Sequence, residues 1–109
     1  MSLTIHPTPE FKKSIKKLFK RYKRIAQDLA QLEEELQNNP HVGIDIGHNC
    51  FKLRLANSSV PTGKSGGFRV IYFLRKEEKI YLLAIYSKSD LENLDDNRLI
   101  EILVSNKLN

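Results

Sequence analysis

The sequence predicts one α+β domain over residues 1–109, with helices packed on a four-stranded, mostly antiparallel sheet in the order β-α-α-β-β-β-α. The length of 109 residues fits one domain, and a hydrophobic content of 40% is enough for one small core. A helix-spaced stripe of apolar residues runs through residues 11–36, and residues 51–55, 68–74 and 80–86 have the composition of strands. These elements together imply one sheet covered by helices.

The chain begins with a short strand over residues 2–6, because Leu3 and Ile5 alternate with polar neighbours. Thr8 then has the character of a helix N-cap, and Pro9 stands at the first helical position, which proline favours. A helix is therefore expected to begin at Pro9.

The apolar stripe has alternating spacings of four and three residues, which is typical of an amphipathic helix: Phe11, Ile15, Leu18, Tyr22, Ile25, Leu29, Leu32 and Leu36. One helix of about 29 residues would be roughly 43 Å long. A domain of this size has a diameter of only about 34 Å. We therefore expect a helical hairpin broken near Lys23–Arg24 and ending at residues 38–40. A single long helix whose stripe forms a dimer seam remains the alternative.

Residues 41–49 contain two glycines and are expected to form a loop. Residues 51–55 alternate most clearly, so their three apolar side chains should face the core while Lys52 and Arg54 face solvent. Residues 57–67 are rich in serine, glycine, threonine and proline, and a second loop is expected there.

Residues 68–74 and 80–86 have apolar residues at both odd and even positions. This pattern is typical of central strands that are covered on both faces. Their short polar connection favours an antiparallel hairpin. Residues 95–107 carry apolar residues at helical spacing and should form a short last helix.

The composition excludes several classes of protein. No apolar run has the length of about 18–20 residues that a membrane span needs, and the first nine residues do not resemble a secretory signal. A single cysteine excludes a disulfide framework and a multi-cysteine metal site. We expect a cytoplasmic protein without a membrane partner.

The positive charge is concentrated near the N-terminus. Residues 10–24 contain eight lysines and arginines and one glutamate: Lys12, Lys13, Lys16, Lys17, Lys20, Arg21, Lys23, Arg24 and Glu10. Such an uneven distribution favours a polyanionic partner, although a lysine-rich helix can also be only a solvated face.

A second group of basic residues is expected at one end of the sheet. Lys52 and Arg54 share one face of a strand, and Arg69 starts the next strand. Tyr86 and Lys88 end the following strand, which an antiparallel hairpin brings back beside Arg69. Arginine and lysine bind phosphate, and tyrosine stacks on a base or donates a hydrogen bond. A purely structural role for these residues remains open.

The sequence gives little support for a metal site, a catalytic cysteine or a nucleotide-binding loop. The three histidines lack metal-ligand spacing, and Cys50 has the character of a small buried residue. Residues 63–67 resemble a phosphate-binding loop only superficially, because the first glycine of that motif is missing and a strand follows. No metal and no cofactor are expected.

Three stretches in this order resemble the RelE/ParE superfamily of small toxins, and most closely its HigB/RelE-like branch. They are Cys-Phe-Lys-Leu-Arg-Leu at 50–55, Gly-Lys-Ser-Gly-Gly-Phe-Arg-Val-Ile-Tyr at 63–72, and the segment 81–90, which follow paired helices ending at residues 36–40. The resemblance implies a compact RelE-like fold. It also implies a toxin of a type II toxin–antitoxin system, acting as a ribosome-dependent endoribonuclease that cleaves messenger RNA in the ribosomal A site.

The resemblance also assigns roles to residues. Lys52 and Arg54 match the basic strand pair of the family, and Arg69 matches its arginine after the glycine–aromatic turn. Lys88 matches a basic position only approximately. RelE has a catalytic tyrosine in its C-terminal segment, whereas this chain has no tyrosine after Tyr86, which becomes the candidate substitute.

The expected reaction needs no metal. The RNA 2′-hydroxyl attacks the adjacent phosphate, Arg69 and Arg54 stabilise the added negative charge, and Lys88 or Lys52 acts as general base. Tyr86 would stack on or orient a base.

The resemblance implies two partners for a monomeric toxin. One is a cognate antitoxin, with which it would form a hetero-oligomer. The other is the ribosome with its messenger and ribosomal RNA, contacted by six lysines: Lys12, Lys13, Lys16, Lys17, Lys20 and Lys64.

Three other functions remain open at this point. They are inhibition of DNA gyrase in the manner of ParE, RNA binding without cleavage, and oligomerisation through the apolar stripe of residues 11–36.

Overall fold

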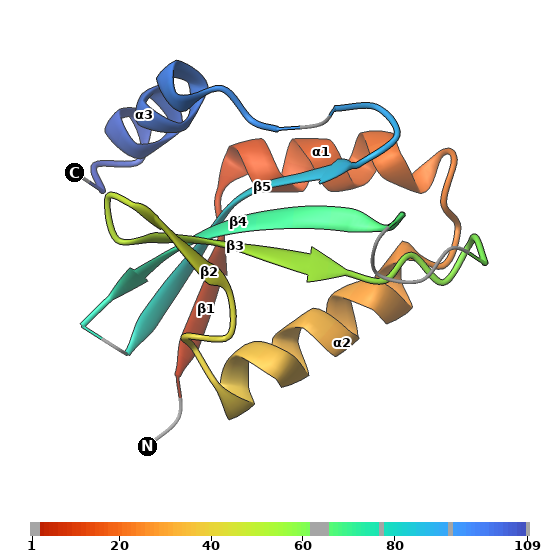
Figure 1. The fold of residues 1–109 in the computed structure, drawn as a ribbon, viewed down its shortest axis with the longest axis horizontal. Helices are drawn as coiled ribbons and strands as arrows, with labels where there is room; N and C mark the ends of the chain where they lie inside the picture. Colours follow the sequence, from red (N-terminus) through yellow and green to blue (C-terminus); the bar gives the residue numbers. More distant parts are fainter. Residues whose placement is uncertain (1–2, 62–65, 77, 92, 109) are drawn as a thin grey trace.

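The computed structural model describes residues 3–61, 66–76, 78–91 and 93–108, and shows a five-stranded sheet with three helices (Figure 1). The strands lie in the order β1-β5-β4-β3-β2. β1 is parallel to β5, and the other neighbouring strands are antiparallel. The elements in chain order are β1 (Thr4–Pro7), α1 (Pro9–Phe19), α2 (Ile25–Asn38), β2 (Ile44–Gly47), β3 (Cys50–Leu55), β4 (Phe68–Arg75), β5 (Lys79–Ser87) and α3 (Asp96–Ser105).

The α+β class and the mostly antiparallel sheet are confirmed, but the expected number of four strands is wrong. The additional strand β2 lies within residues 41–49, where a loop was expected. All four residues of β2 are exposed, and a bulge interrupts its pairing with β3 between Asp45 and Gly47. Ile44 and Ile46 alternate with Asp45, but this pattern is short and lies between Gly43 and Gly47, which favoured a loop. A short, irregular edge strand of this kind has no buried face.

The helical hairpin is confirmed. Thr8 caps α1 by accepting a hydrogen bond from the backbone N–H of Phe11 at 3.2 Å, and Pro9 begins the helix. The break falls at residues 20–24, which contain neither glycine nor proline. Here the backbone N–H of Arg24 donates to the hydroxyl of Ser59 at 3.2 Å, so a distant loop supports the start of α2. The apolar stripe therefore covers two helices of one compact domain.

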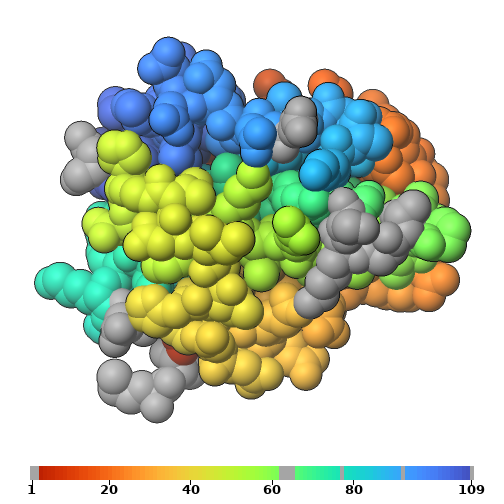
Figure 2. Space-filling model, viewed as in Figure 1, coloured from red at the N-terminus to blue at the C-terminus, as the bar shows by residue number. Residues whose placement is uncertain are grey.

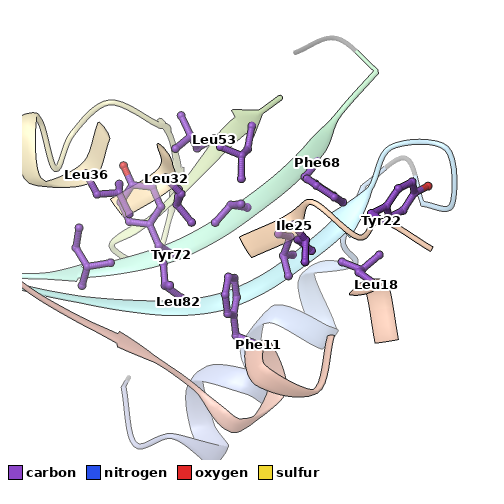
Figure 3. Close-up of a cluster of buried hydrophobic side chains, with 14 of the residues drawn as sticks. Phe11, Leu18, Tyr22, Ile25, Leu32, Leu36, Leu53, Phe68, Tyr72 and Leu82 are labelled. Atoms are coloured by element: carbon purple, nitrogen blue, oxygen red, sulfur yellow. The ribbon is translucent and has the colours of Figure 1, made fainter. Parts of the chain in front are cut away.

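The main core lies between these two helices and one face of the sheet. Figure 3 shows the aromatic and aliphatic side chains of α1, α2 and the central strands meeting there. The labelled residues are Phe11, Leu18, Tyr22, Ile25, Leu32, Leu36, Leu53, Phe68, Tyr72 and Leu82, each at most 8% exposed. Burial of this apolar surface, at about 25 cal/mol per Å², is the main contribution to stability.

A second core lies on the opposite face, beneath α3. Leu99, Ile102 and Leu103 of this helix pack against Ile71 of β4 and Leu83 of β5. The register of β4 and β5 shifts between Ile71 and Tyr72, which is the geometry of a bulge. α3 covers only part of this face, because it lies over one end of the strands (Figure 1). The opposite end of the same face carries the basic residues described below.

No helix among the described residues is long and apolar enough to cross a membrane.

Candidate functional site

A cleft of about 220 Å³ opens on the α3 side of the sheet, on the part of this face that α3 leaves uncovered. Four basic residues, one apolar residue and one amide line it: Lys52, Arg54, Arg69, Lys88, Ile44 and Asn93. We call this the cationic cleft. Figure 2 shows the segments that form its rim side by side, with β2 and β3 in yellow to lime and the segment after β5 in blue. The cleft therefore joins residues that are far apart in the sequence.

The register of the sheet places two arginines together at its centre. Arg54 of β3 is directly opposite Arg69 of β4, and Arg69 is directly opposite Tyr86 of β5. Residues paired in this way have side chains on the same face, with Cβ atoms about 4.5–5.5 Å apart. Two like charges so placed destabilise the sheet. A bound anion would reduce this repulsion.

Arg69 is held in a position from which its charge acts strongly. The residue is only 3% exposed, and its Nη1 donates to the carbonyl oxygen of Phe68 at 3.2 Å. An arginine side chain does not lose its proton under protein conditions. Its positive charge therefore persists in a poorly hydrated environment, where it attracts an anion more strongly than it would in water.

Gly67 helps to position Lys88 at the cleft. A Cβ atom at this position would lie 2.3 Å from the carbonyl oxygen of Leu55, so the close approach of the two strands requires glycine. The carbonyl oxygen of Gly67 accepts a hydrogen bond from the backbone N–H of Lys88 at 3.1 Å. This bond fixes Lys88 next to the start of β4 while its side chain stays exposed.

The fourth basic residue has a partner in the segment after β5. The Nζ of Lys52 donates to Oδ1 of Asn93 at 2.6 Å. Asn93 and Ile44 were not among the residues expected from the sequence. Asn93 lies in a polar loop and Ile44 in a short exposed strand, so neither carries a local signal of function. Only the folded arrangement brings them to the cleft.

Tyr86 is adjacent to the cleft but does not line it with the basic residues. Its side chain lies in the core beneath α3 and is 8% exposed, which leaves almost no ring surface for stacking on a base. Among the described residues its buried hydroxyl forms no hydrogen bond. Burial raises the pKa of this hydroxyl, although the neighbouring backbone of Leu94 and the charge of Arg69 act in the opposite direction. The expected stacking role therefore does not fit this conformation.

The lysines of α1, and Lys20 just after it, do not line the cationic cleft. Lys12 and Lys16 line an apolar groove between α1 and α2, and Lys17 lines a groove beside β5 and α3. Lys13 borders both grooves, and Lys20 follows the end of α1. All five are exposed, as a contact surface for a polyanion requires. Lys64 lies outside the described residues.

The structure offers no obvious metal ligands in its described part. Within residues 3–61, 66–76, 78–91 and 93–108, no three histidine, cysteine, aspartate or glutamate side chains are grouped to hold an ion. Cys50 is fully buried, and burial raises the pKa of its thiol to about 12. A thiol in this state is not a nucleophile at neutral pH.

The fold and the cationic cleft define a small basic α+β protein with four basic residues at one open end of its sheet. A model of the RelE toxin of RelE/RelB toxin–antitoxin systems matches residues 10–107. The chain therefore belongs to the RelE toxin family, and it is a toxin of a toxin–antitoxin system.

Two solved structures have a similar fold. One is a double mutant of the Escherichia coli toxin RelE in the free state, at 16% identity and a TM-score of 0.56, covering 84% of this chain and 90% of that one. The other is the same mutant in complex with a peptide of the antitoxin RelBc, at 15% identity and a TM-score of 0.55. That match covers 88% of this chain and 98% of the other. The expected RelE-like fold is thus confirmed.

Proposed function

We propose that this toxin is a metal-independent endoribonuclease that inhibits translation by cleaving messenger RNA in the ribosomal A site. The observation that carries the proposal is the cationic cleft, where Lys52, Arg54, Arg69 and Lys88 converge around a space of about 220 Å³. A cleft of this size is smaller than the roughly 300–1,000 Å³ of pockets for drug-sized ligands. It suits a single phosphate and part of one nucleotide.

The proposed reaction uses the RNA's own 2′-hydroxyl. Its oxygen attacks the adjacent phosphorus and loses its proton to a base, while the bond from phosphorus to the 5′-oxygen breaks. The leaving 5′-oxygen takes up a proton, and the products are a 2′,3′-cyclic phosphate and a free 5′-hydroxyl. The five-coordinate transition state carries more negative charge than the substrate, so preorganised cations stabilise it preferentially.

The position of each basic residue supports a different role. Arg69, nearly buried and always charged, stabilises the transition state together with Arg54 opposite it. Lys88 and Lys52 reach the same cleft from the end of β5 and from β3. One of them serves as general base for the 2′-hydroxyl, and the other protonates the leaving oxygen.

Tyr86 contributes by packing rather than by contact with RNA in this proposal. It is paired with Arg69 in the sheet and buried beneath α3, so it supports the strand from which the arginine projects. This role replaces the stacking that the sequence led us to expect. A tyrosine with a raised pKa also stays protonated at neutral pH, so it adds no negative charge beside Arg69.

The exposed lysines of α1 form the proposed contact with ribosomal RNA, joined by Lys64. Reversing the charges of Lys12, Lys13, Lys16 and Lys17 should weaken ribosome binding and flatten its dependence on salt without altering the cleavage chemistry. Binding would be measured by cosedimentation with ribosomes at increasing salt. An unchanged salt dependence would show that these lysines do not contact the RNA.

A cognate antitoxin is the second proposed partner. The family pairs a RelE toxin with an antitoxin, and the similar E. coli toxin has been solved with an antitoxin peptide. Acidic groups of an antitoxin would complement the cationic cleft. Action on translating ribosomes and on an antitoxin also implies a cytoplasmic protein.

The decisive experiment follows messenger RNA in a translating cell-free extract. Wild-type protein should produce cuts at discrete coding positions only when ribosomes are engaged. Arg54→Ala, at an exposed position, should reduce the rate on the order of 10²–10³-fold, and Arg69→Ala should do the same provided that it folds. Arg75→Ala removes the same charge from the other end of β4 and should cleave normally.

Intact messenger RNA with wild-type protein would refute the nuclease proposal. Wild-type rates in folded Arg54→Ala and Arg69→Ala would refute the assigned roles. Circular dichroism of every variant would separate loss of chemistry from loss of fold.

A further inference from the structure

One apolar residue lines the otherwise polar cationic cleft. Ile44 is 69% exposed and lies in the lining with four basic residues and Asn93. Single exposed apolar side chains are common on proteins and need no explanation by themselves. Here the side chain lies beside a proposed phosphate-binding site. A nucleotide bound there would bring both a charged and an apolar part into the cleft.

The position of Ile44 is fixed from two sides. It is the cross-strand partner of Lys52, so the two side chains share the face of the sheet that carries the cleft. The preceding Gly43 donates its backbone N–H to the hydroxyl of Tyr72 at 3.0 Å, and that hydroxyl donates to the carbonyl oxygen of Pro40 at 2.8 Å. Tyr72 is fully buried, so it anchors the start of β2 to the main core.

Asn93 is oriented by the same lysine. The ammonium group of Lys52 can only donate hydrogen bonds, so the atom of Asn93 at 2.6 Å is the amide oxygen. The NH2 group of Asn93 therefore points away from Lys52. Within the described residues no hydrogen bond uses this NH2 group. It offers two donors at the rim of the cleft.

We propose that Ile44 and Asn93 form a subsite for one nucleobase beside the phosphate-binding cations. The face of the base lies on the side chain of Ile44, and the NH2 group of Asn93 donates to an oxygen on the edge of the base. This inference rests on the proposed function only in that its ligand is RNA. Lys52 lies between the two residues, paired with one in the sheet and hydrogen-bonded to the other.

The polarity of the subsite gives it a preference. Guanine, uracil and cytosine have an exocyclic carbonyl oxygen that accepts a hydrogen bond, whereas the acceptors of adenine are ring nitrogens alone and its exocyclic amine faces the donor of Asn93 with another donor. One partly exposed hydrogen bond corresponds to about a two- to tenfold difference in affinity. Adenine should therefore bind least well of the four bases at this position.

The test measures binding of five-nucleotide RNAs with a 2′-deoxy substitution at the central nucleotide, which prevents cleavage. Fluorescence anisotropy would compare probes that carry each of the four bases, or no base, on either side of the central phosphate. The proteins are wild type, Ile44→Ala, Asn93→Asp and the matched control Ile46→Ala. Ile46 is an exposed isoleucine of the same strand that does not line the cleft.

Wild type should bind a base about two- to tenfold more tightly than the abasic probe. Ile44→Ala should lose most of this difference, and Ile46→Ala should keep it. Asn93→Asp replaces the donor by an acceptor, so the order should shift toward adenine. The ratio among bases is the readout, because the added charge weakens every probe alike.

Equal binding of base-bearing and abasic probes by wild type would overturn the proposal, as would failure to bind any probe. An Ile44→Ala profile identical to that of wild type would also overturn it. Base-dependent binding without cuts in the extract would instead keep the subsite and reject the nuclease. The two proposals therefore fail in different experiments.

Discussion

Replacing Arg54 with glutamine should stabilise the protein while it weakens the proposed activity. Arg54 and Arg69 are directly opposite each other on adjacent antiparallel strands, and Arg69 is 3% exposed. Their repulsion is part of the folded state and is relieved when the chain unfolds. Arg54→Gln keeps a long polar side chain and removes one of the two charges.

The size of the effect follows from this pairing. Cross-strand charge pairs contribute about 0.2–1 kcal/mol, with the sign set by the charges. At about 4–8 °C per kcal/mol for a small domain, the melting temperature should rise by roughly 1–8 °C. Salt at 1 M shortens the screening length to about 3 Å, so most of the gain should disappear there.

Thermal and urea unfolding at low and high salt would measure this gain. Arg98→Gln is the control for general charge, because it removes one positive charge from a protein of net charge +5 at a site where Glu101 is the neighbour, 3.5 Å away. The reasoning is supported if Arg54→Gln raises the stability more than Arg98→Gln does at low salt, and if this difference disappears at high salt. A variant less stable than wild type at low salt, or an equal gain at both salt concentrations, would refute it.

Three further predictions concern the surroundings of the site. Tyr86→Phe removes a buried hydroxyl that forms no hydrogen bond with the described residues, so the free energy of unfolding in urea should rise by about 1 kcal/mol, and a fall would reveal a hidden partner. Gly67→Ala places a Cβ atom 2.3 Å from the carbonyl oxygen of Leu55, so thermal unfolding should show a loss of about 1–3 kcal/mol, and wild-type stability would mean that the strands separate easily. Burial alone would raise the pKa of Glu10, but hydrogen bonds from Asn106 and Ser105 hold it below its usual value. Glu10 therefore stabilises the fold above pH 4.5, and this contribution is lost as the pH falls through the lowered pKa; melting curves of Glu10→Gln should lack this acid-dependent loss.

The sequence predicted secondary structure well where burial imposes a regular spacing of apolar residues. Residues 51–55 alternate because one face of β3 covers the main core, and β4 is apolar apart from Arg69 and Arg75 because its two faces contribute to the two cores. The hairpin of α1 and α2 was inferred from length alone. Its turn combines local backbone hydrogen bonds with a contact between Arg24 and Ser59, and a local pattern does not encode that contact.

Only the part of the site that depends on the pairing of neighbouring strands could be predicted from the sequence. An antiparallel hairpin places Arg69 near Tyr86–Lys88 even in a crude alignment, but the exact pairing of Arg69 with Tyr86 depends on the register shift between Ile71 and Tyr72. The burial of Tyr86 depends on where α3 and the segment after β5 pack, which the sequence did not reveal. Asn93 enters the cleft through a hydrogen bond with Lys52, a residue 41 positions earlier.

The strand order has a consequence for how the protein is made. β1 is synthesised first, yet its partner is β5, with Thr4 opposite Lys79. The apolar side chains of α1 and α2 pack against residues of β3, β4 and β5, which are synthesised later. These side chains therefore have no complete sheet to pack on until β5 has been made. Lys88 completes the cationic cleft only after β5 has joined the sheet. The cationic cleft therefore forms only after most of the molecule has been made.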